Sequence, residues 1–158
     1  DVTTGLLLTP WPLATMIMAP LAGRLVERIH AGILGGIGMT IFATGLFLLA
    51  ILPDNPTNTD IIWRLFICGA GFGLFQTPNN STIISSAPSN RSGGASGMLG
   101  TARLLGQTLG ATLVAMIFNL VSNNSTQACL YLATGFAVVA AIISSLRISQ
   151  PRPLKGFK

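Results

Sequence analysis

Long segments with little or no charge recur along the chain, and they constrain its fold more than any other feature of the sequence. A helix needs roughly twenty apolar residues to cross the ~30 Å hydrocarbon core of a bilayer. Five segments meet that length, at residues 2–22, 33–52, 61–87, 94–121 and 126–146. The connections between them are short. The sequence therefore predicts an all-α fold, a polytopic transmembrane helix bundle with five transmembrane helices.

The charge content supports this prediction. Only 8% of the 158 residues are charged, whereas soluble domains usually carry about 25%. Nine Lys or Arg and four acidic side chains are too few to cover a soluble surface. The net charge of +5 would suit nucleic acid, but the basic residues gather between the apolar segments and at the C-terminus. That placement indicates membrane topology, and no nucleic-acid partner is expected.

The positive-inside rule orients the predicted spans, because short cytoplasmic loops are enriched in Lys and Arg. The loop at 23–32 carries Arg24 and Arg28, and the loop at 88–93 carries Arg91. The loops at 53–60 and 122–124 carry neither Lys nor Arg. We therefore expect the first and third loops to be cytoplasmic, together with a basic cytoplasmic tail at 147–158. At the outer edge of the third span, Trp63 and Arg64 fit an interfacial anchor.

Proline and glycine inside the spans predict kinks and close helix packing. Proline removes a backbone donor, which a membrane helix tolerates mainly where protein or a water-filled cavity satisfies the freed groups. The prolines within spans are Pro10, Pro12, Pro20 and Pro78. Glycines four residues apart let two backbones approach closely; these pairs are Gly32 with Gly36, Gly69 with Gly73, Gly93 with Gly97, and Gly106 with Gly110. Static packing and helices that slide on one another both remain open.

Polar side chains at membrane depth point to a bundle interior or a cavity, since they are costly elsewhere. The third span contains QTPNNST, residues 76–82, and the fourth contains Arg103 and Gln107. Asn79 and Asn80 have an alternative interpretation as helix-end caps. Arg103 also has an alternative interpretation, as a side chain that extends toward the inner membrane–water interface. Gln107 lies near the middle of its span and is harder to explain in that way.

The sequence lacks the residues that an intramembrane enzyme needs. The only histidine, His30, falls in a loop and is interpreted as an ordinary solvated side chain. The acids lie outside the predicted spans, at Asp1, Glu27, Asp54 and Asp60. Cys68 and Cys129 fall in apolar stretches and are interpreted as small buried hydrophobic residues. We therefore expect no catalytic residues, no metal site and no cofactor.

The loop sequence GRLVERIHAG resembles the cytoplasmic loop motif of the major facilitator superfamily, G-x-L-a-D-r-x-G-r-k. Gly23, Leu25 and Arg28 match this motif, and Glu27 takes the acidic place. The second half of the motif is lost, because His30 replaces its glycine and the next two residues replace its basic pair.

Other stretches are similar to the C-terminal region of the fourteen-span drug:proton antiporters of that superfamily, and most of all to the methyl viologen resistance-type exporters of enteric bacteria. These stretches are LLLTPWPL, QTPNNSTI and APSNRSGGASGMLGTARLLGQTLG. The resemblance implies that the five spans are the last five of fourteen. It also implies a bacterial inner membrane location and, as partner, a missing N-terminal half of the same transporter, and it leads us to expect that the chain is a fragment.

The resemblance further implies a proton-coupled multidrug exporter that moves lipophilic or quaternary ammonium cations by alternating access. The first, third and fourth spans would line the cavity, and the second and fifth would lie outside it. Candidate substrate contacts are Trp11, Met16, Phe72, Phe75, Gln76 and Gln107. The gating loop would hold Gly23, Arg24, Glu27 and Arg28, and helix packing or kinks would involve Pro78, Gly106 and Gly110. The proton-binding carboxylates are expected upstream. An importer of another solute and a non-transporting membrane scaffold remain alternatives.

Overall fold

The computed structural model describes residues 2–53, 55–121 and 124–146, and these residues form helices without any strand. The helices are α1 (Val2–Leu8), α2 (Pro10–Val26), α3 (Ala31–Ala50), α4 (Asn58–Ser85), the short 3₁₀ helix η1 (Ser89–Arg91), α5 (Ser92–Leu120) and α6 (Ser125–Leu146). The all-α fold class is confirmed. The basic tail at 147–158 lies outside the described residues.

The first predicted span is a broken helix, and proline explains the break. Neither Pro10 nor Pro12 has a backbone N–H to continue the α-helical ladder. At the junction, the Thr9 N–H donates to the Leu6 carbonyl at 3.3 Å, and the Thr9 carbonyl accepts from the Leu13 N–H at 3.3 Å. A new helix, α2, then begins at Pro10. The predicted distortion of this span is therefore confirmed near its N-terminal end.

Side chains that cap helices define the starts of α3 and α4. The Nδ1 atom of His30 accepts a hydrogen bond from the Gly32 N–H at 3.2 Å. His30 is half-buried, so the interpretation as an ordinary solvated side chain is wrong. At the start of α4, Thr57 and Asp60 form a reciprocal capping box. The hydrogen bonds from Thr57 lower the pKa of the exposed Asp60 carboxyl below its usual value.

Four stretches of the described chain are long and apolar enough to cross a membrane: Gly5–Val26, Ala31–Ala50, Ser92–Leu120 and Ser125–Leu146. Helix α4 corresponds to the third predicted span and has 28 residues, but it is not among these four. Its polar run at 76–82 lowers the hydropathy of its second half. Because α4 packs between α2 and α3, much of its surface faces protein, and a fifth crossing stays a prediction.

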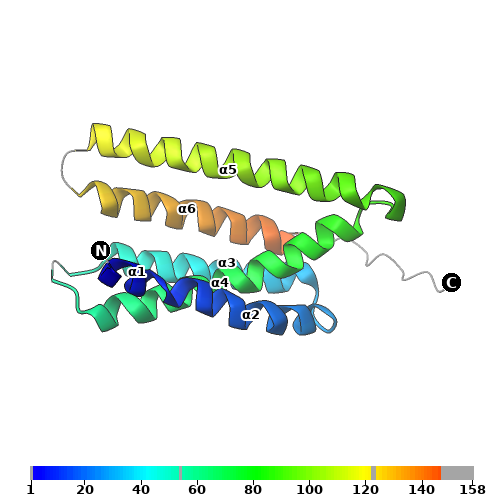
Figure 1. Cartoon of the computed structure of the whole chain (residues 1–158), viewed down its shortest axis with the longest axis horizontal. Coiled ribbons are helices and arrows are strands. Elements are labelled where there is room, and N and C mark those ends of the chain that lie inside the picture. Colours follow the sequence, from blue (N-terminus) through cyan, green and yellow to red (C-terminus); the bar gives the residue numbers. More distant parts are fainter. Residues whose placement is uncertain (1, 54, 122–123, 147–158) are drawn as a thin grey trace.

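The helices divide into a closely packed group and one loosely attached member (Figure 1). Helix α4 packs extensively on α2 and α3, and α3 packs in turn on α6. Buried side chains gather in two clusters. One joins α3, α4 and α6 through Met39, Ala43, Leu46, Cys68, Ala137 and Ala141. The other joins α2, α3 and α4 through Ala22, Leu34 and Leu74. By contrast, α5 has few contacts with α4 and α6 and contains no buried residue.

Successive long helices run in opposite directions, so alternate connections share one end of the molecule. Figure 1 shows the α2–α3 turn, the α4–α5 connection and the C-terminal end of α6 at one end, and the other connections at the opposite end. Arg24, Arg28 and Arg91 therefore lie at the same end. This arrangement is the one that the alternation of basic and non-basic loops predicts.

Candidate functional site: an aromatic cluster between three helices

Glycine residues of α4 let two neighbouring helices approach its backbone. A Cβ atom at Gly69 would lie 2.9 Å from the Cβ of Ala14 on α2. A Cβ atom at Gly71 would lie 2.7 Å from the carbonyl oxygen of Gly38 on α3. Both distances are too short for a side chain, so only glycine permits this spacing. The Thr15 hydroxyl donates across the α2–α4 interface to the Gly69 carbonyl at 3.1 Å and also lies 3.0 Å from the Trp11 carbonyl of its own helix.

This close approach brings three aromatic rings from three helices together. The ring centroids of Trp11 (α2) and Phe72 (α4) are 6.2 Å apart. Phe42 of α3 completes the cluster, with its centroid 5.7 Å from Trp11 and 5.8 Å from Phe72. The Trp11 and Phe42 rings meet edge to face at 79°, a favourable arrangement for aromatic pairs. All three rings are partly buried. We call Trp11, Phe42 and Phe72 the aromatic cluster.

Two further predicted contacts, Gln76 and Phe75, lie on α4 and are close to the aromatic cluster in sequence. Gln76 follows Phe72 by four residues, which places both on the same side of the helix, and it is partly buried. Phe75 also packs toward α3, at a different point, since a Cβ at Gly35 would lie 3.6 Å from its Cδ2 atom. Together with Trp11 and Phe42, Phe75 packs against the buried cluster that joins α3, α4 and α6.

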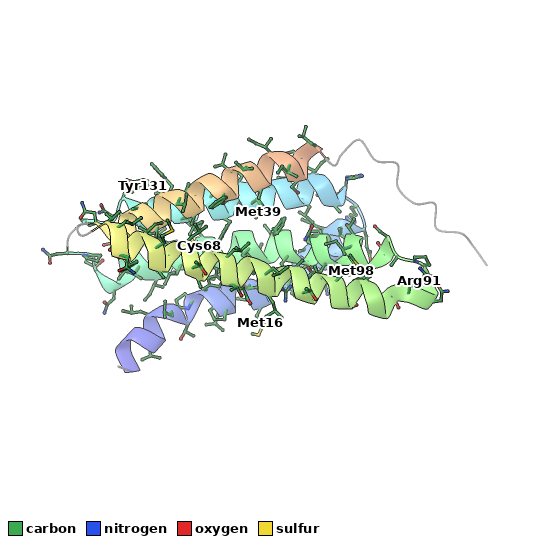
Figure 2. All side chains as sticks on the ribbon, turned by 90° about the horizontal axis from the view of Figure 1, so that it is seen from above. Met16, Met39, Cys68, Arg91, Met98 and Tyr131 are labelled. Atoms are coloured by element: carbon green, nitrogen blue, oxygen red, sulfur yellow. The ribbon has the colours of Figure 1, made fainter. Side chains whose placement is uncertain are left out.

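The other two predicted contacts are not brought to the aromatic cluster within the described residues. Met16 is 67% exposed and lies on the face of α2 away from Ala14, which is fully buried; Figure 2 shows its side chain at the margin of the molecule. Gln107 lies on α5, is exposed, and belongs to a helix that barely contacts the packed group. Their roles in a substrate site stay predictions.

Pro78 and the two glycines assigned to packing or kinks have contrasting surroundings. Pro78 is fully buried inside α4, and its carbonyl accepts a hydrogen bond from the Thr82 hydroxyl at 2.8 Å. Gly106 and Gly110 of α5 have no atom within 4 Å of where a Cβ would stand. Asn79 and Asn80 lie inside α4, which continues to Ser85, so their interpretation as caps of a helix end is wrong.

The predicted gating loop is shorter than the sequence suggests. Helix α2 continues to Val26, which places Gly23 and Arg24 in its last turn, and Glu27 caps its C-terminus. The connection closes through the Leu25 carbonyl, which accepts from the N–H groups of Arg28 at 3.0 Å and of Ile29 at 2.7 Å. Arg24, Glu27 and Arg28 are exposed and available to contact other helices.

Charge is sparse around the aromatic cluster. The described carboxylates, Glu27 and Asp60, lie at opposite ends of the molecule and are not inside the helix packing. Arg64 on α4 lies with its guanidinium carbon 5.0 Å from the Trp63 ring centroid. Its Nε and Nη1 atoms are buried without a hydrogen-bond partner among the described residues. No group of three His, Cys, Asp or Glu side chains that would hold a metal ion occurs in that part of the chain.

Sequence reasoning missed Phe42, because α3 corresponds to a span that was expected to lie outside the cavity. The signal that would have found it is the spacing Gly38, Phe42 and Gly45, at i, i+4 and i+7 on one helix face. Both glycines contact α4, Gly38 near Gly71 and Gly45 near Cys68. A large ring between two such glycines must lie against α4.

Comparisons with known proteins agree with this helical architecture. The family model described as Major Facilitator Superfamily matches residues 1–158. The chain is 64% identical over 152 residues to the uncharacterized transporter YebQ of Escherichia coli K12, which covers 96% of the chain and 33% of YebQ. It is 32% identical to the multidrug resistance protein Stp of Mycobacterium tuberculosis, over 72% of the chain and 21% of Stp.

The riboflavin transporter RibZ of Clostridioides difficile is 30% identical, over 72% of the chain and 25% of RibZ. The chain thus spans a third or less of the length of each of these relatives. No solved structure gives a significant match. Three findings lead to one conclusion: the family match covers the whole chain, relatives are named as transporters, and four helices are apolar enough to cross a bilayer. The chain belongs to the major facilitator superfamily of transporters, and it is a multi-pass membrane protein.

Proposed function

We propose that the chain forms the C-terminal part of a fourteen-span, proton-coupled exporter of lipophilic cations in the bacterial inner membrane, with its basic tail in the cytoplasm. Export would proceed by alternating access, in which two halves of the transporter rock about a site near the middle of the membrane. The direction of transport is supported by the relative Stp, which is named as a multidrug resistance protein. The orientation is supported by the gathering of Arg24, Arg28 and Arg91 at one end of the bundle.

The observation that carries this proposal is the aromatic cluster. A cation within about 6 Å of an aromatic ring face is attracted by the ring quadrupole, by about 2 kcal/mol or more when the cation is desolvated. Three partly buried rings from three helices, at centroid separations of 5.7 to 6.2 Å, offer several such faces. Gln76 adds an uncharged polar group one turn along α4 from Phe72. A delocalised organic cation needs few other contacts for binding, because its charge is spread over many atoms and is weakly hydrated.

The coupling protons are assigned to a different part of the transporter. A proton relay through a membrane protein typically uses acidic side chains within the spans. The four carboxylates of this chain, Asp1, Glu27, Asp54 and Asp60, all lie outside its predicted spans. In this proposal the chain supplies cavity wall and gating surface, and proton-binding groups lie in the rest of the protein. Gly23, Arg24, Glu27 and Arg28 would serve as the latch between helices.

A second candidate function has one observation in its favour. RibZ, named as a riboflavin transporter, is 30% identical to the chain. A flat, uncharged heterocycle would also stack on aromatic side chains, since offset stacking needs no charge. An importer of such a solute would use the same aromatic cluster. The two functions differ in the charge of the substrate and in the direction of movement.

The proposal is tested by substrate movement in inverted membrane vesicles that contain the full-length protein, with ethidium as a permanent organic cation and riboflavin as a neutral competitor. Phe72→Ala should weaken the apparent affinity for ethidium by roughly tenfold, because the loss of one cation–π contact is worth about 1.4 kcal/mol. Phe72→Tyr should retain it. Phe66→Ala is the matched control, since Phe66 lies on the same helix and outside the aromatic cluster.

Three outcomes would contradict the exporter proposal. Equal ethidium affinity of Phe72→Ala and Phe66→Ala would remove the aromatic cluster from the substrate site. Competition by riboflavin with no ethidium movement would favour the second function. Movement of neither compound, with the protein folded and in the membrane, would favour a scaffold.

A further inference from the structure

The outer surface of the α3–α6 pair carries a groove that the transport proposal does not use. One section has a volume of about 410 Å³ and is lined by Thr40, Ala43, Thr44, Phe47, Thr134, Val138, Ala141, Ile142 and Ser145. A second section of about 340 Å³ is lined by Ile33, Gly36, Ile37, Thr40, Ile41 and Ser145. Thr40 and Ser145 line both sections, so the two are continuous. None of the predicted substrate contacts lines either section.

Small residues form the floor of this groove and large ones form its walls. The small residues Gly36, Ala43 and Ala141 of α3 and α6 line the groove. A Cβ at Gly36 would lie 3.6 Å from the Ala141 carbonyl oxygen. The same pair of helices is joined by the Ser144 hydroxyl, which donates to the Gly32 carbonyl at 3.3 Å. The hollow is therefore a consequence of tight helix packing, with Ile37, Phe47, Val138 and Ile142 rising on its sides.

The groove walls are effectively apolar although four hydroxyls line them. The Thr40, Thr44 and Thr134 hydroxyls donate to carbonyls of their own helices at 2.9, 2.9 and 2.7 Å. The Ser145 hydroxyl likewise donates to the Ala141 carbonyl. With these protons engaged, the groove offers no free donor to a polar solute. It matches a hydrocarbon chain, and both of its helices are among those apolar enough to cross a bilayer.

The length and the charge of the groove identify the occupant. From Ile33 to Phe47 the groove follows α3 for fourteen residues, or ~21 Å at 1.5 Å per residue. One leaflet of the hydrocarbon core is ~15 Å deep, so the groove is long enough for an acyl chain. Its Ile33 end lies at the α2–α3 turn, which carries the exposed Arg28, and Tyr131 marks the opposite end of α6 (Figure 2). Arg24 and Glu27, both exposed, lie close to Arg28 in the sequence, so these three side chains together carry one net positive charge.

We infer that this groove retains one anionic phospholipid, with an acyl chain lying between α3 and α6 and the headgroup at the basic end near Arg28. Clustered basic residues at a membrane surface attract anionic lipids by about 1 kcal/mol per charge. The groove lies on a different face of the molecule from the aromatic cluster, so lipid retention in the groove does not depend on which substrate is transported.

The test uses two pairs of neighbouring residues on α6 that are alike in type and exposure but differ in their position. Val138 and Ile142 line the groove, whereas Val139 and Ile143 do not. Their exposed fractions are 45% and 55% for the groove pair, and 53% and 57% for the control pair. The substitutions Val138→Phe and Ile142→Trp would fill the groove. The substitutions Val139→Phe and Ile143→Trp add the same volume elsewhere on the helix.

The experiment is native mass spectrometry of the delipidated full-length protein, titrated with phosphatidylglycerol or with phosphatidylcholine of the same acyl chains. We expect tighter retention of phosphatidylglycerol, a roughly tenfold weaker apparent affinity in each groove variant, and unchanged affinity in each control variant. Equal retention of the two lipids would overturn the proposal. Equal effects of groove and control variants would do the same, as would a dimer mass that is lost in the groove variants, because a second copy would then occupy the groove.

Discussion

Helices α4 and α5 have nearly the same length, 28 and 29 residues, and both carry glycines four residues apart. Their surroundings are opposite. Gly69 and Gly73 of α4 lie against Ala14, Thr15 and Met18 of α2, whereas α5 has no buried residue. Glycine spacing permits a close approach between helices but does not supply the partner. The partner surface of α4 lies within this chain, and for α5 the described residues provide almost none.

The exposed apolar surface of α5 follows from this difference. Leu104, Leu105 and Leu109 are among its large exposed side chains, and contiguous surfaces of that kind mark contact with membrane or with other protein. The hydroxyls of Thr108 and Thr112 donate to carbonyls of α5 itself, so these two groups need no partner on another helix. Helix α5 is long and apolar enough to cross a membrane, and few described residues contact it.

The largest expected effect compares a packed glycine with an open one. Gly71→Ala should lower the free energy of unfolding of the chain in detergent by about 3 kcal/mol, because the new Cβ would collide with backbone atoms of α3. Gly110→Ala should leave it unchanged or raise it by up to about 1 kcal/mol, since alanine is the better helix former. Denaturation followed by far-UV circular dichroism measures both. Equal losses would mean that α5 is packed as tightly as α4.

A smaller effect concerns the starts of the helices. His30 caps α3 through its side chain, whereas Arg91 at the start of α5 makes no side-chain cap hydrogen bond. His30→Ala should therefore destabilise the chain by about 1 kcal/mol, and Arg91→Ala should not. His30→Asn, which keeps a capping acceptor, is the conservative control. The same denaturation measurement applies, and a loss in His30→Asn equal to that in His30→Ala would show that the cap contributes little.

The smallest effect separates a hydroxyl that reaches across an interface from one that stays on its own helix. Thr15→Val removes the hydrogen bond to Gly69 on α4, and interhelical bonds of this kind are worth about 0.6 kcal/mol in membrane proteins. Thr108→Val on α5 removes only a bond to Leu104 on the same helix. Hydrogen exchange of the α4 amides should increase in Thr15→Val alone. A matching increase in Thr108→Val would place α5 against α4.

The helices could be predicted to within a few residues because length and hydropathy act locally. The break at Thr9 followed from Pro10 and Pro12, whose missing N–H groups no context restores. The loop predicted at 23–32 is too long, since helix α2 continues through Arg24 to Val26. Charge marks where a helix leaves lipid, and it does not mark where its hydrogen bonds end.

The candidate site was predicted only in part. Trp11 and Phe72 were identified as candidates from the resemblance, and the structure brings their rings together. Phe42 was missed, because which residue of α3 meets α4 depends on how the glycine faces of the two helices dock. Met16 and Gln107 were assigned to the same site, but both side chains are exposed and neither belongs to the aromatic cluster.

By itself, the sequence determined the helical class, the approximate bounds of the helices and the separation of basic from non-basic connections, since each depends on residues near one another along the chain. Only the tertiary structure decided which glycines contact a neighbouring helix, which aromatic rings meet and which helix has few neighbours. Those outcomes depend on the shapes of two surfaces at once, and a single sequence segment describes only one of them.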